Sequence, residues 1–292
     1  MDARGQFHPG PQTLPNLRGV GRAAGAPRDA AGLTHPGGRE RNEDQFLVAD
    51  VERCVRVRAT SVPADESPHQ LAASAGTLAA VADGMGGHGS GDLASAVTVD
   101  GVLDYVVHDM PWPVSFDEDH RRELLEGFGA AVKRVQHRLW EVAKRKHASP
   151  KLGTTLTVAY LLPHELFVGH VGDSRCYVLR EGHLTQLTED HTLAQQARRE
   201  RPDLDLSHLS HILVNAIGGD QGDPKADGLW VELHPHDRVL LCSDGLTDVV
   251  DDDVVADRLA RATNAEEAVH LLVRAGVEAG ADDNVTAVAA FA

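Results

Sequence analysis

Hydrophobic residues recur every three or four positions over about residues 118–147, which predicts a long amphipathic helix. Its apolar stripe consists of Leu125, Phe128, Val132, Val135, Leu139 and Val142. Helical patterns also cover about residues 92–108, 253–262 and 265–279. The chain is therefore expected to carry two pairs of helices, well separated along the sequence.

Elsewhere the pattern predicts short β-strands, most of them with a hydrophobic period of two. They are expected at residues 45–50, 77–82, 154–162, 166–171, 175–179, 183–187, 229–233, 238–242 and 284–291. Val55 and Val57, which alternate with arginines, predict a further half-exposed strand before a loop at residues 60–75. The strands follow one another so closely that they are expected to pair antiparallel. The order of elements predicts an α+β domain with helices packed on its sheets.

Two segments lie outside this pattern. Residues 1–30 are rich in Gly, Pro, Ala and Arg without a hydrophobic period, which predicts a disordered tail before a domain at residues 31–292. Residues 191–211 are polar, weakly apolar and helical in propensity, and we expect them to form a mobile excursion from that domain.

Composition narrows the class of protein. With 42% hydrophobic and 25% charged residues, the chain is typical of a globular protein. Its 44 acidic against 28 basic residues give a net charge of −16, which argues against nucleic acid or an anionic membrane as the main partner. No apolar run of about 18 residues predicts a membrane span, and no apolar leader precedes a cleavage site. We therefore expect a cytoplasmic protein.

Cysteine and histidine do not predict a disulfide framework or a zinc site. Cys54, Cys176 and Cys242 are odd in number, lie far apart and form no Cys-x-x-Cys, so they are expected to be buried in a reducing compartment. Histidine pairs such as His208 and His211 lack further ligands at zinc spacing.

Aspartates recur at one structural position, where a strand meets a turn. The motifs are Asn42-Glu43-Asp44, Asp83-Gly84-Met85-Gly86-Gly87, Gly172-Asp173-Ser174-Arg175, Ser243-Asp244-Gly245-Leu246-Thr247-Asp248 and Asp282-Asp283-Asn284. A single aspartate at a strand end is ordinarily a turn former. Repetition favours a site instead, because strand ends at one edge of a sheet converge in space.

Converging carboxylates repel one another, and bound cations relieve the repulsion. Hard oxygen ligands select Mg²⁺ or Mn²⁺. Two such ions about 3.5–4 Å apart can share a carboxylate and a hydroxide, an arrangement used for phosphoryl hydrolysis.

The glycine-rich turn at residues 84–89 also fits the G-x-G-x-x-G pattern of dinucleotide-binding proteins. Asp83 argues against that function, because its carboxylate would face the pyrophosphate. No Gly-Lys-Ser/Thr follows for a P-loop, and Ser90 lacks the flanking glycines of a nucleophile elbow. We favour the interpretation that Gly84 offers its carbonyl to a metal and that the later glycines let the chain turn tightly around the ions.

Further motifs complete an ordered set along the chain. The set is Gly37-x-Arg39-x-x-Asn42-Glu43-Asp44, Val81-Ala82-Asp83-Gly84-Met85-Gly86-Gly87-His88, Gly153-Thr154-Thr155, Gly172-Asp173-Ser174-Arg175, Leu187-Thr188-x-Asp190-His191, Ala216-Ile217-Gly218, Ser243-Asp244-Gly245-Leu246-x-Asp248 and Asp283-Asn284-Val285-Thr286. From about residue 33 to the C-terminus, this order resembles the metal-dependent (type 2C, PPM) serine/threonine protein phosphatases, in their bacterial branch. The resemblance implies a four-layer α-β-β-α sandwich, with two antiparallel sheets flanked by helices.

The resemblance also implies a binuclear Mg²⁺ or Mn²⁺ centre. Asp83 would bridge the two ions, and Asp244 and Asp283 would complete the shell of one of them. The Gly84 carbonyl would bind the other ion.

Further acids would complete the metal site of such a phosphatase. Glu43 and Asp44 would hold the ion at Gly84 through water. Asp173 and Asp248, together with Asp244, resemble a third and weaker metal site.

Arg39 would clamp the phosphate, because its planar guanidinium is a bidentate donor. Met85 stands where animal members of the family carry a histidine proposed as general acid. The proton for the leaving group would then come from metal-bound water or another residue, for which His88 is a candidate. Residues assigned to support of the site rather than to chemistry are Asn42, Asp190 and Asn284.

These features predict hydrolysis of phosphoserine and phosphothreonine in proteins by a metal-bridging hydroxide, with Arg39 and Asp83 as catalytic residues. The expected partners are phosphorylated proteins, the targets of a serine/threonine kinase, and we expect a monomer. Two alternatives stay open: a pseudophosphatase that binds or scaffolds, and a phosphatase of small phosphoesters. Residues 191–211 correspond to the variable flap of the family, and residues 251–253 are interpreted as a helix cap and solvated surface.

Overall fold

The computed structural model describes residues 28–52, 75–86, 90–111, 117–149, 151–201, 209–219 and 222–292. The predicted strand at Val55 and Val57 lies outside these residues, as do the loop that follows it up to residue 74 and residues 1–27 of the predicted tail.

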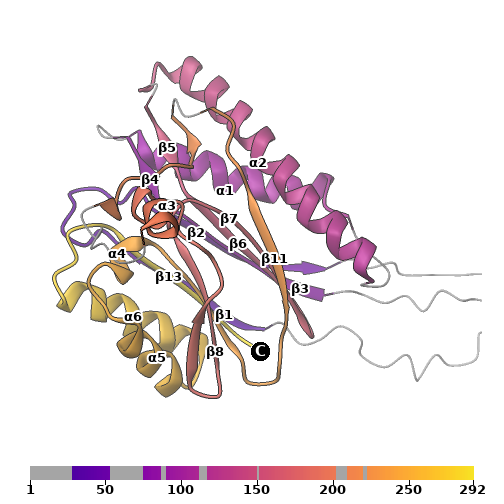
Figure 1. The fold of residues 1–292 in the computed structure, drawn as a ribbon, viewed down its shortest axis with the longest axis vertical. Helices are drawn as coiled ribbons and strands as arrows, with labels where there is room; N and C mark the ends of the chain where they lie inside the picture. Colours follow the sequence, from indigo (N-terminus) through magenta and orange to yellow (C-terminus); the bar gives the residue numbers. More distant parts are fainter. Residues whose placement is uncertain are drawn as a thin grey trace, which may run out of the picture.

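Two five-stranded sheets form the centre of the described structure (Figure 1). The first has the order β1 (Asp29–His35), β13 (Val285–Phe291), β12 (Arg238–Cys242), β8 (Arg175–Arg180), β9 (His183–Gln186). The second has the order β11 (Asp227–Glu232), β7 (Glu165–Val171), β6 (Leu156–Leu162), β3 (Ala75–Ala82), β2 (Gln45–Glu52). Neighbouring strands pair antiparallel in both sheets, which confirms the predicted meanders.

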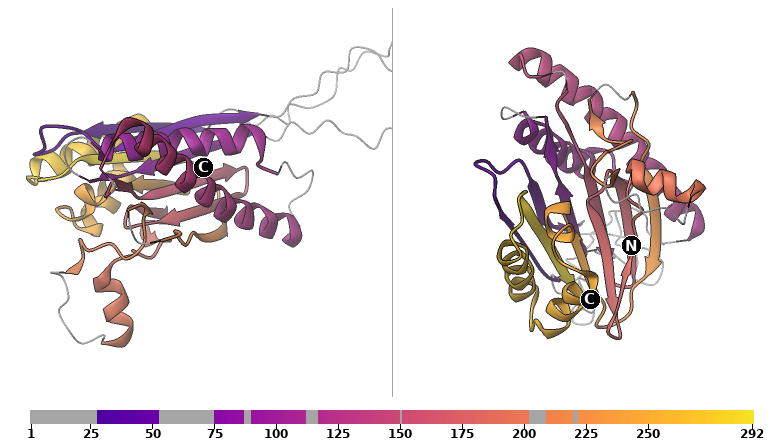
Figure 2. Two further views of the ribbon diagram at one scale, coloured as in Figure 1. Left: turned by 90° about the horizontal axis from the view of Figure 1, so that it is seen from above. Right: turned by 60° about the vertical axis from the view of Figure 1, so that its left-hand side comes forward.

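Helices cover the outer face of each sheet. Helices α1 (Gly91–His108) and α2 (Glu118–Lys146) lie over the second sheet, and α5 (Asp252–Arg261) and α6 (Ala265–Glu278) lie over the first (Figure 1). The two sheets face each other between these helical layers (Figure 2). The predicted four-layer sandwich is therefore confirmed.

Strand alternation explains why the sandwich has three apolar layers. In β13, Ala287 and Ala289 face the helices α5 and α6, whereas Val288 and Ala290 face the opposite sheet. Both faces of the strand are buried, so its sequence is apolar except for Thr286. The layer between the sheets is completed from the second sheet by residues such as Leu161 and Leu166, both 0% exposed.

A small third sheet joins the sandwich near the end of β3. It has the order β10 (Ile217–Gly218), β5 (Gly153–Thr154), β4 (Gly84–Met85). Thr155 separates β5 from β6, so the single strand predicted over residues 154–162 is two strands. The break matters because Thr155 supports the neighbouring Asp83, as described below.

The first strand is one that the sequence pattern does not predict. Asp29 and Ala30, assigned to the tail, belong to β1 and pair with Phe291 and Ala290. The strand is short of β-branched residues, and long-range pairing with β13 holds it in place. Gly32 fits there because a Cβ would lie 2.4 Å from the ring of Phe46.

The acids before α5 differ in part from the prediction. Asp251 stands at the N-cap of α5, but its side chain accepts no hydrogen bond from the helix. The Asp252 carboxylate instead accepts a hydrogen bond of 3.3 Å from the Tyr177 hydroxyl. Their contribution to capping is thus limited to the favourable helix dipole.

The flap segment, residues 191–211, contains the predicted helix. Helix α3 (Leu193–Glu200) begins at Thr192, whose hydroxyl accepts a hydrogen bond of 3.2 Å from Gln195 N, and it stands out from the sheets (Figure 2). Among the described helices, none combines the length and the apolarity that crossing a bilayer requires.

Leu161→Ala tests the layer between the sheets. Because the side chain is 0% exposed, we expect the substitution to lower the free energy of unfolding by about 2–5 kcal/mol in urea titrations. Val107→Ala, at a position 69% exposed, serves as control and should change it by less than about 0.5 kcal/mol. Equal effects of the two substitutions would contradict the assigned core.

Candidate active site

Strand register brings the predicted acids to one end of the sandwich. The pair Gln45↔Ala82 in β2 and β3 sets Asp44 beside Asp83. In the other sheet, the pair Cys242↔Arg175 sets Asp244 near Asp173. Strand β13 begins at Val285, directly after Asp283 and Asn284. Five motifs scattered along the sequence therefore meet where strands of both sheets end.

Asp83 is buried among three other carboxylates. Burial raises its pKa well above the usual value, and the negative charges of Asp44, Asp244 and Asp173 raise it further. The carboxyl groups of Asp83 and Asp244 lie within hydrogen-bonding distance of each other, so they can share a proton. This is the electrostatic conflict that the sequence motifs predicted.

Two threonines fix the backbone of Asp83. The Asp83 N–H donates to Thr155 Oγ1 at 2.9 Å, and the Asp83 carbonyl accepts from Thr155 N–H at 2.9 Å and from Thr154 Oγ1 at 2.8 Å. The Thr155 hydroxyl also contacts Ser174 Oγ at 2.7 Å. The position of the central carboxylate is thus set by the motif Gly153-Thr154-Thr155.

Asp44 and Asp244 each carry a buried oxygen without a partner. Asp44 Oδ2 accepts from Ser243 Oγ at 2.8 Å and from Thr286 Oγ1 at 2.6 Å, whereas Asp44 Oδ1 and Asp244 Oδ1 have no hydrogen-bond partner. Burial is the main cause that raises the pKa of Asp44 to about 7 and that of Asp244 to about 6. Unpaired buried oxygens of this kind are costly unless something binds them.

Glu43 and the Gly84 carbonyl lie close together, next to Gly91. A Cβ at Gly91 would lie 2.4 Å from Glu43 Oε2 and 2.6 Å from Gly84 O. These two oxygens therefore converge at the start of α1. The Ser95 hydroxyl donates to the Glu43 carbonyl at 2.5 Å and ties that segment to the helix. The predicted grouping of Glu43 with the Gly84 carbonyl matches this geometry.

Arg39 lies against Asp283 in the structure. Arg39 Nη2 donates to Asp283 Oδ2 at 2.7 Å, and Arg39 Nε donates to the Asp282 carbonyl at 3.1 Å. The guanidinium side chain is 58% exposed, so it borders solvent. In the structure, therefore, the positive charge beside Asp283 comes from Arg39.

Asn284 joins the loop after β1 to the start of β13. Its Oδ1 accepts from Glu43 N at 2.7 Å, and its Nδ2 donates to the carbonyls of Pro36 at 3.0 Å and Arg41 at 2.9 Å. Gly37 is required in that loop because its φ is +57° and a Cβ would lie 1.9 Å from the Asp283 carbonyl. The predicted supporting role of Asn284 thus has a geometric basis.

The remaining acids form the other side of the cluster. Burial raises the pKa of Asp173 well above its usual value, with further effects of Asp244, Asp190 and Asp248. Asp190 does not face the cluster freely, because Arg175 binds it through Nε at 3.0 Å and Nη2 at 2.7 Å. Burial likewise raises the pKa of Asp248.

The chemistry of the donor set fits divalent cations. The unpaired oxygens of Asp44 and Asp244, the raised pKa of Asp83 and the Gly84 carbonyl are what oxygen-coordinated ions would satisfy. Within the described ranges, however, no three His, Cys, Asp or Glu side chains have the spacing of a formed metal site.

Sequence reasoning missed the hydroxyl groups that hold the acids. These hydroxyls belong to residues within the quoted motifs: Ser243, Thr286, Thr155 and Ser174. The sequence does not reveal which way a hydroxyl next to an aspartate points. Met85 lies in β4 opposite Gly153, which its side chain contacts. His88, the candidate proton donor, lies outside the described residues.

Comparison with known proteins is informative once this geometry is clear. The family model described as "Protein phosphatase 2C" matches residues 58–278. The chain belongs to the protein phosphatase 2C family. The predicted resemblance is thereby confirmed.

Individual relatives within the protein phosphatase 2C family are bacterial. The chain is 35% identical over 217 residues to serine/threonine protein phosphatase PstP of Mycobacterium tuberculosis, covering 73% of this chain but 40% of that relative. It is 30% identical over 210 residues to serine/threonine phosphatase stp of Listeria welshimeri, covering 70% of this chain and 81% of that relative.

One solved structure has been described as the catalytic domain of PstP in complex with two manganese ions. It superimposes with a TM-score of 0.65 at 28% identity, covering 90% of this chain and 96% of that chain. The two proteins share the phosphatase 2C fold over nearly the whole described domain.

The stability of the metal-free protein should fall as pH rises. Burial raises the folded-state pKa of Asp44 to about 7 and that of Asp244 to about 6, above the usual value of 3.8. These groups therefore stabilise the folded state fully below about pH 3.8, and the effect is lost progressively up to about pH 6 for Asp244 and about pH 7 for Asp44. Melting in EDTA should therefore shift to lower temperature between pH 5 and pH 8. Asp44→Asn should reduce this slope.

Asp251→Asn is the control for the pH series, because the residue is exposed at the start of α5. It should keep the wild-type slope. A melting temperature that rises over this pH range, or an unchanged slope in Asp44→Asn, would contradict the assigned charge cluster.

Proposed function

We propose that this protein hydrolyses phosphoserine and phosphothreonine in proteins at a centre of two Mg²⁺ or Mn²⁺ ions. The main support is the group of converging carboxylates around Asp83, in which Asp44 and Asp244 have unpaired buried oxygens. The partly exposed guanidinium of Arg39 lies beside this group. Such an arrangement requires cations and has a donor ready for an anion. Membership in the protein phosphatase 2C family supports the same activity.

The residues that would hold the ions follow from the geometry and the motifs. Asp83 would lie between the two ions, with Asp244 and Asp283 on one side and the Gly84 carbonyl on the other. Glu43 and Asp44 would bind water beside Gly84, as the approach of Glu43 to Gly84 suggests. A third, weaker site would use the acids on the far side of the cluster: Asp173, Asp244 and Asp248.

The bound ions would supply a hydroxide at neutral pH and offset negative charge on the phosphoryl group. The chain's own residues position the reactants. Threonines 154 and 155 fix the Asp83 backbone, so the carboxylate stays at the centre of the cluster. Arg39, once free of Asp283, would hold two phosphoryl oxygens and orient the phosphorus for attack.

The substrates we propose are phosphorylated proteins, the targets of a serine/threonine kinase. We place the reaction in the cytoplasm, in accord with two buried free thiols, Cys176 and Cys242. The protein would act as a monomer. No observation on the described residues favours a scaffolding role or a small phosphoester over this function.

Phosphate release from a phosphopeptide should require Mn²⁺ or Mg²⁺ and should fail in EDTA. Asp83→Asn and Asp244→Asn should each lower kcat by about 10²-fold or more, because each removes charge that the ions need. Asp251→Asn, an exposed acid of the same type, should retain wild-type kcat.

Two further measurements separate the alternatives. Calorimetry that detects no Mn²⁺ binding by the wild-type protein would support the pseudophosphatase. A small phosphoester hydrolysed with higher kcat/KM than any phosphopeptide would identify the protein as a phosphatase of small phosphoesters. Activity that survives in Asp83→Asn would exclude the binuclear centre.

Arg39→Ala should raise KM for a phosphopeptide about tenfold or more, because it removes a bidentate donor to the phosphoryl oxygens. Arg39→Lys should recover only part of the loss, since an ammonium cannot donate two parallel hydrogen bonds. Inhibition by inorganic phosphate should weaken in parallel. A KM that stays at the wild-type value in Arg39→Ala would contradict the assigned clamp.

A further inference from the structure

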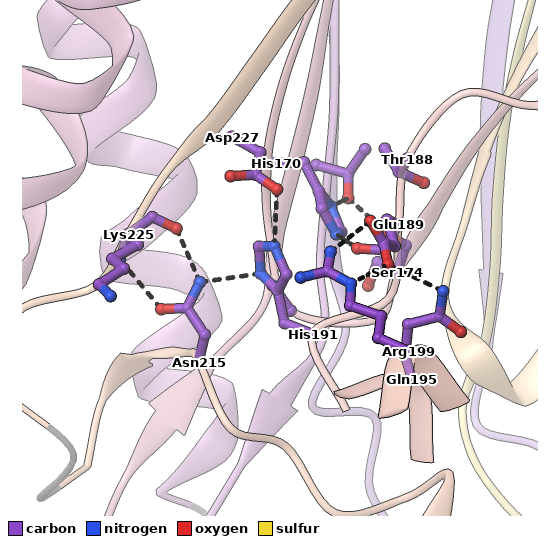
Figure 3. A network of polar contacts seen from close by, with 12 residues as sticks. His170, Ser174, Thr188, Glu189, His191, Gln195, Arg199, Asn215, Lys225 and Asp227 are labelled. Atoms are coloured by element: carbon purple, nitrogen blue, oxygen red, sulfur yellow. Dashed lines mark hydrogen bonds and ion pairs between the residues drawn. The ribbon is translucent and has the colours of Figure 1, made fainter. Parts of the chain in front are cut away.

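His191, at the beginning of the flap segment, lies between Asn215 and Asp227 (Figure 3). It also holds the turn that carries Asp173. Its backbone N–H donates to the Gly172 carbonyl at 2.7 Å, and its ring Nδ1 accepts from Gly172 N–H at 3.0 Å. His191 thus binds both the N–H and the carbonyl of Gly172. Gly172 directly precedes Asp173, so these two hydrogen bonds fix the backbone from which the Asp173 side chain extends.

The same residue also binds Val214 and Asn215, which lie just beyond residue 211 and form the returning end of the flap. The His191 carbonyl accepts from Val214 N–H at 2.9 Å, and Nδ1 accepts a second hydrogen bond from Asn215 Nδ2 at 2.8 Å. On the other side of the ring, Nε2 lies 3.0 Å from Asp227 Oδ2 at the start of β11. His191 therefore joins both ends of the flap to the turn.

Neighbouring hydrogen bonds determine which ring nitrogen carries the proton. Asn215 Oδ1 accepts from Lys225 N–H at 3.0 Å, and Asn215 Nδ2 donates to the Lys225 carbonyl at 2.7 Å, which fixes the orientation of the amide. The amide thus presents N–H groups to His191, and Nδ1 must accept. The proton lies on Nε2 and points to Asp227.

A second, buried histidine continues the network inward. The rings of His170 and His191 lie 4.8 Å apart, and burial lowers the pKa of His170 to about 4, which keeps it neutral. His170 Nδ1 contacts Thr157 Oγ1 at 2.9 Å, and Thr157 Oγ1 donates to the Ser174 carbonyl at 2.8 Å.

The residue after Asp173 completes the connection to the central acid. Ser174 Oγ contacts Thr155 Oγ1 at 2.7 Å, and Thr155 Oγ1 accepts from Asp83 N–H at 2.9 Å. Gly172 permits this packing, because its φ is +110° and a Cβ would lie 2.6 Å from Thr155. Contacts on both sides of Asp173 therefore lead to the flap and to Asp83.

We propose that His191 is a positioning residue, which sets the Asp173 carboxylate in the acidic site according to how the two ends of the flap segment are seated. The inference rests on the proposed metal-dependent phosphatase function. It assigns to His191 two separable contacts: an acceptor at Nδ1 for the turn, and a donor at Nε2 for Asp227.

Two substitutions separate these contacts. In His191→Asn, the amide oxygen can take the place of Nδ1 and accept from Gly172 N–H, while the donor to Asp227 is lost. In His191→Gln, the amide N–H can take the place of Nε2, while the acceptor for Gly172 is lost. A merely structural staple would be weakened by both changes, whereas the proposed positioning depends on the acceptor.

The first readout is hydrogen exchange of the Gly172 amide by NMR in the metal-free protein. We expect His191→Gln to accelerate this exchange about tenfold, as loss of one hydrogen bond allows, and His191→Asn to keep it near the wild-type rate. This arm needs neither metal nor activity.

The second readout is the Mn²⁺ concentration that gives half-maximal phosphatase activity. His191→Gln should raise it about tenfold or more, the usual effect of losing a residue that orients a metal ligand, and should leave KM for the phosphopeptide within about twofold of wild type. His191→Asn should restore the wild-type Mn²⁺ requirement. Asn215→Ala, which removes one donor to Nδ1, should shift it in the same direction by less, and it serves if His191→Gln does not fold.

His183→Gln is the matched control, because His183 is exposed and its ring contacts the Glu181 carbonyl of its own hairpin, at 3.2 Å, rather than the flap or the acidic site. It should behave as wild type in both readouts. Wild-type behaviour of His191→Gln, or failure of His191→Asn to restore both values, would overturn the inference. A wild-type protein without Mn²⁺-dependent activity would refute the proposed function instead, and the exchange readout would still decide whether His191 holds the turn.

Discussion

Repulsion among carboxylates at the shared ends of two sheets is the constraint on which the rest of the site depends. Antiparallel register sets Asp44 beside Asp83 and Asp244 near Asp173, so the fold itself brings the charges together. Without cations the cluster favours protons: burial, with a further effect of the neighbouring carboxylates, raises the pKa of Asp44 to about 7. The hydroxyls of Ser243 and Thr286 compensate only one oxygen of that group. The fold thus creates a demand for positive charge that its own side chains do not meet.

Much of this could be predicted from the sequence, because hydrophobic period reports which faces are buried. Strands such as β12 and helices such as α2 were predicted within a few residues, and the aspartate motifs indicated one site. Strand β1 was not predicted, because it is held by pairing with β13, which lies far along the chain. The direction in which a side chain points could not be predicted either. No sequence pattern reveals that Asp283 lies against Arg39, or that Thr155 fixes Asp83.

The contact between Arg39 and Asp283 links charge balance to substrate binding. Both residues are assigned to the reaction, one to phosphate and one to a metal, yet in the structure each satisfies the other. A cation at Asp283 would remove the partner of the guanidinium and leave it available for an anion. On the opposite side of the cluster, the histidines at positions 170 and 191 tie the flap to the turn at Asp173 through neutral hydrogen bonds. The acidic site thus has the Arg39–Asp283 ion pair on one side and the hydrogen bonds of the two histidines on the other.

The most direct test is a crystal structure of the protein grown with Mn²⁺ and measured at the manganese absorption edge. Two anomalous peaks should flank the Asp83 carboxylate, about 3.5–4 Å apart, with Asp244 on one ion and the Gly84 carbonyl on the other. Asp283 should have turned away from Arg39. Absence of manganese at Asp83 in the Mn²⁺-grown crystals, with Arg39 still bound to Asp283, would contradict the binuclear centre.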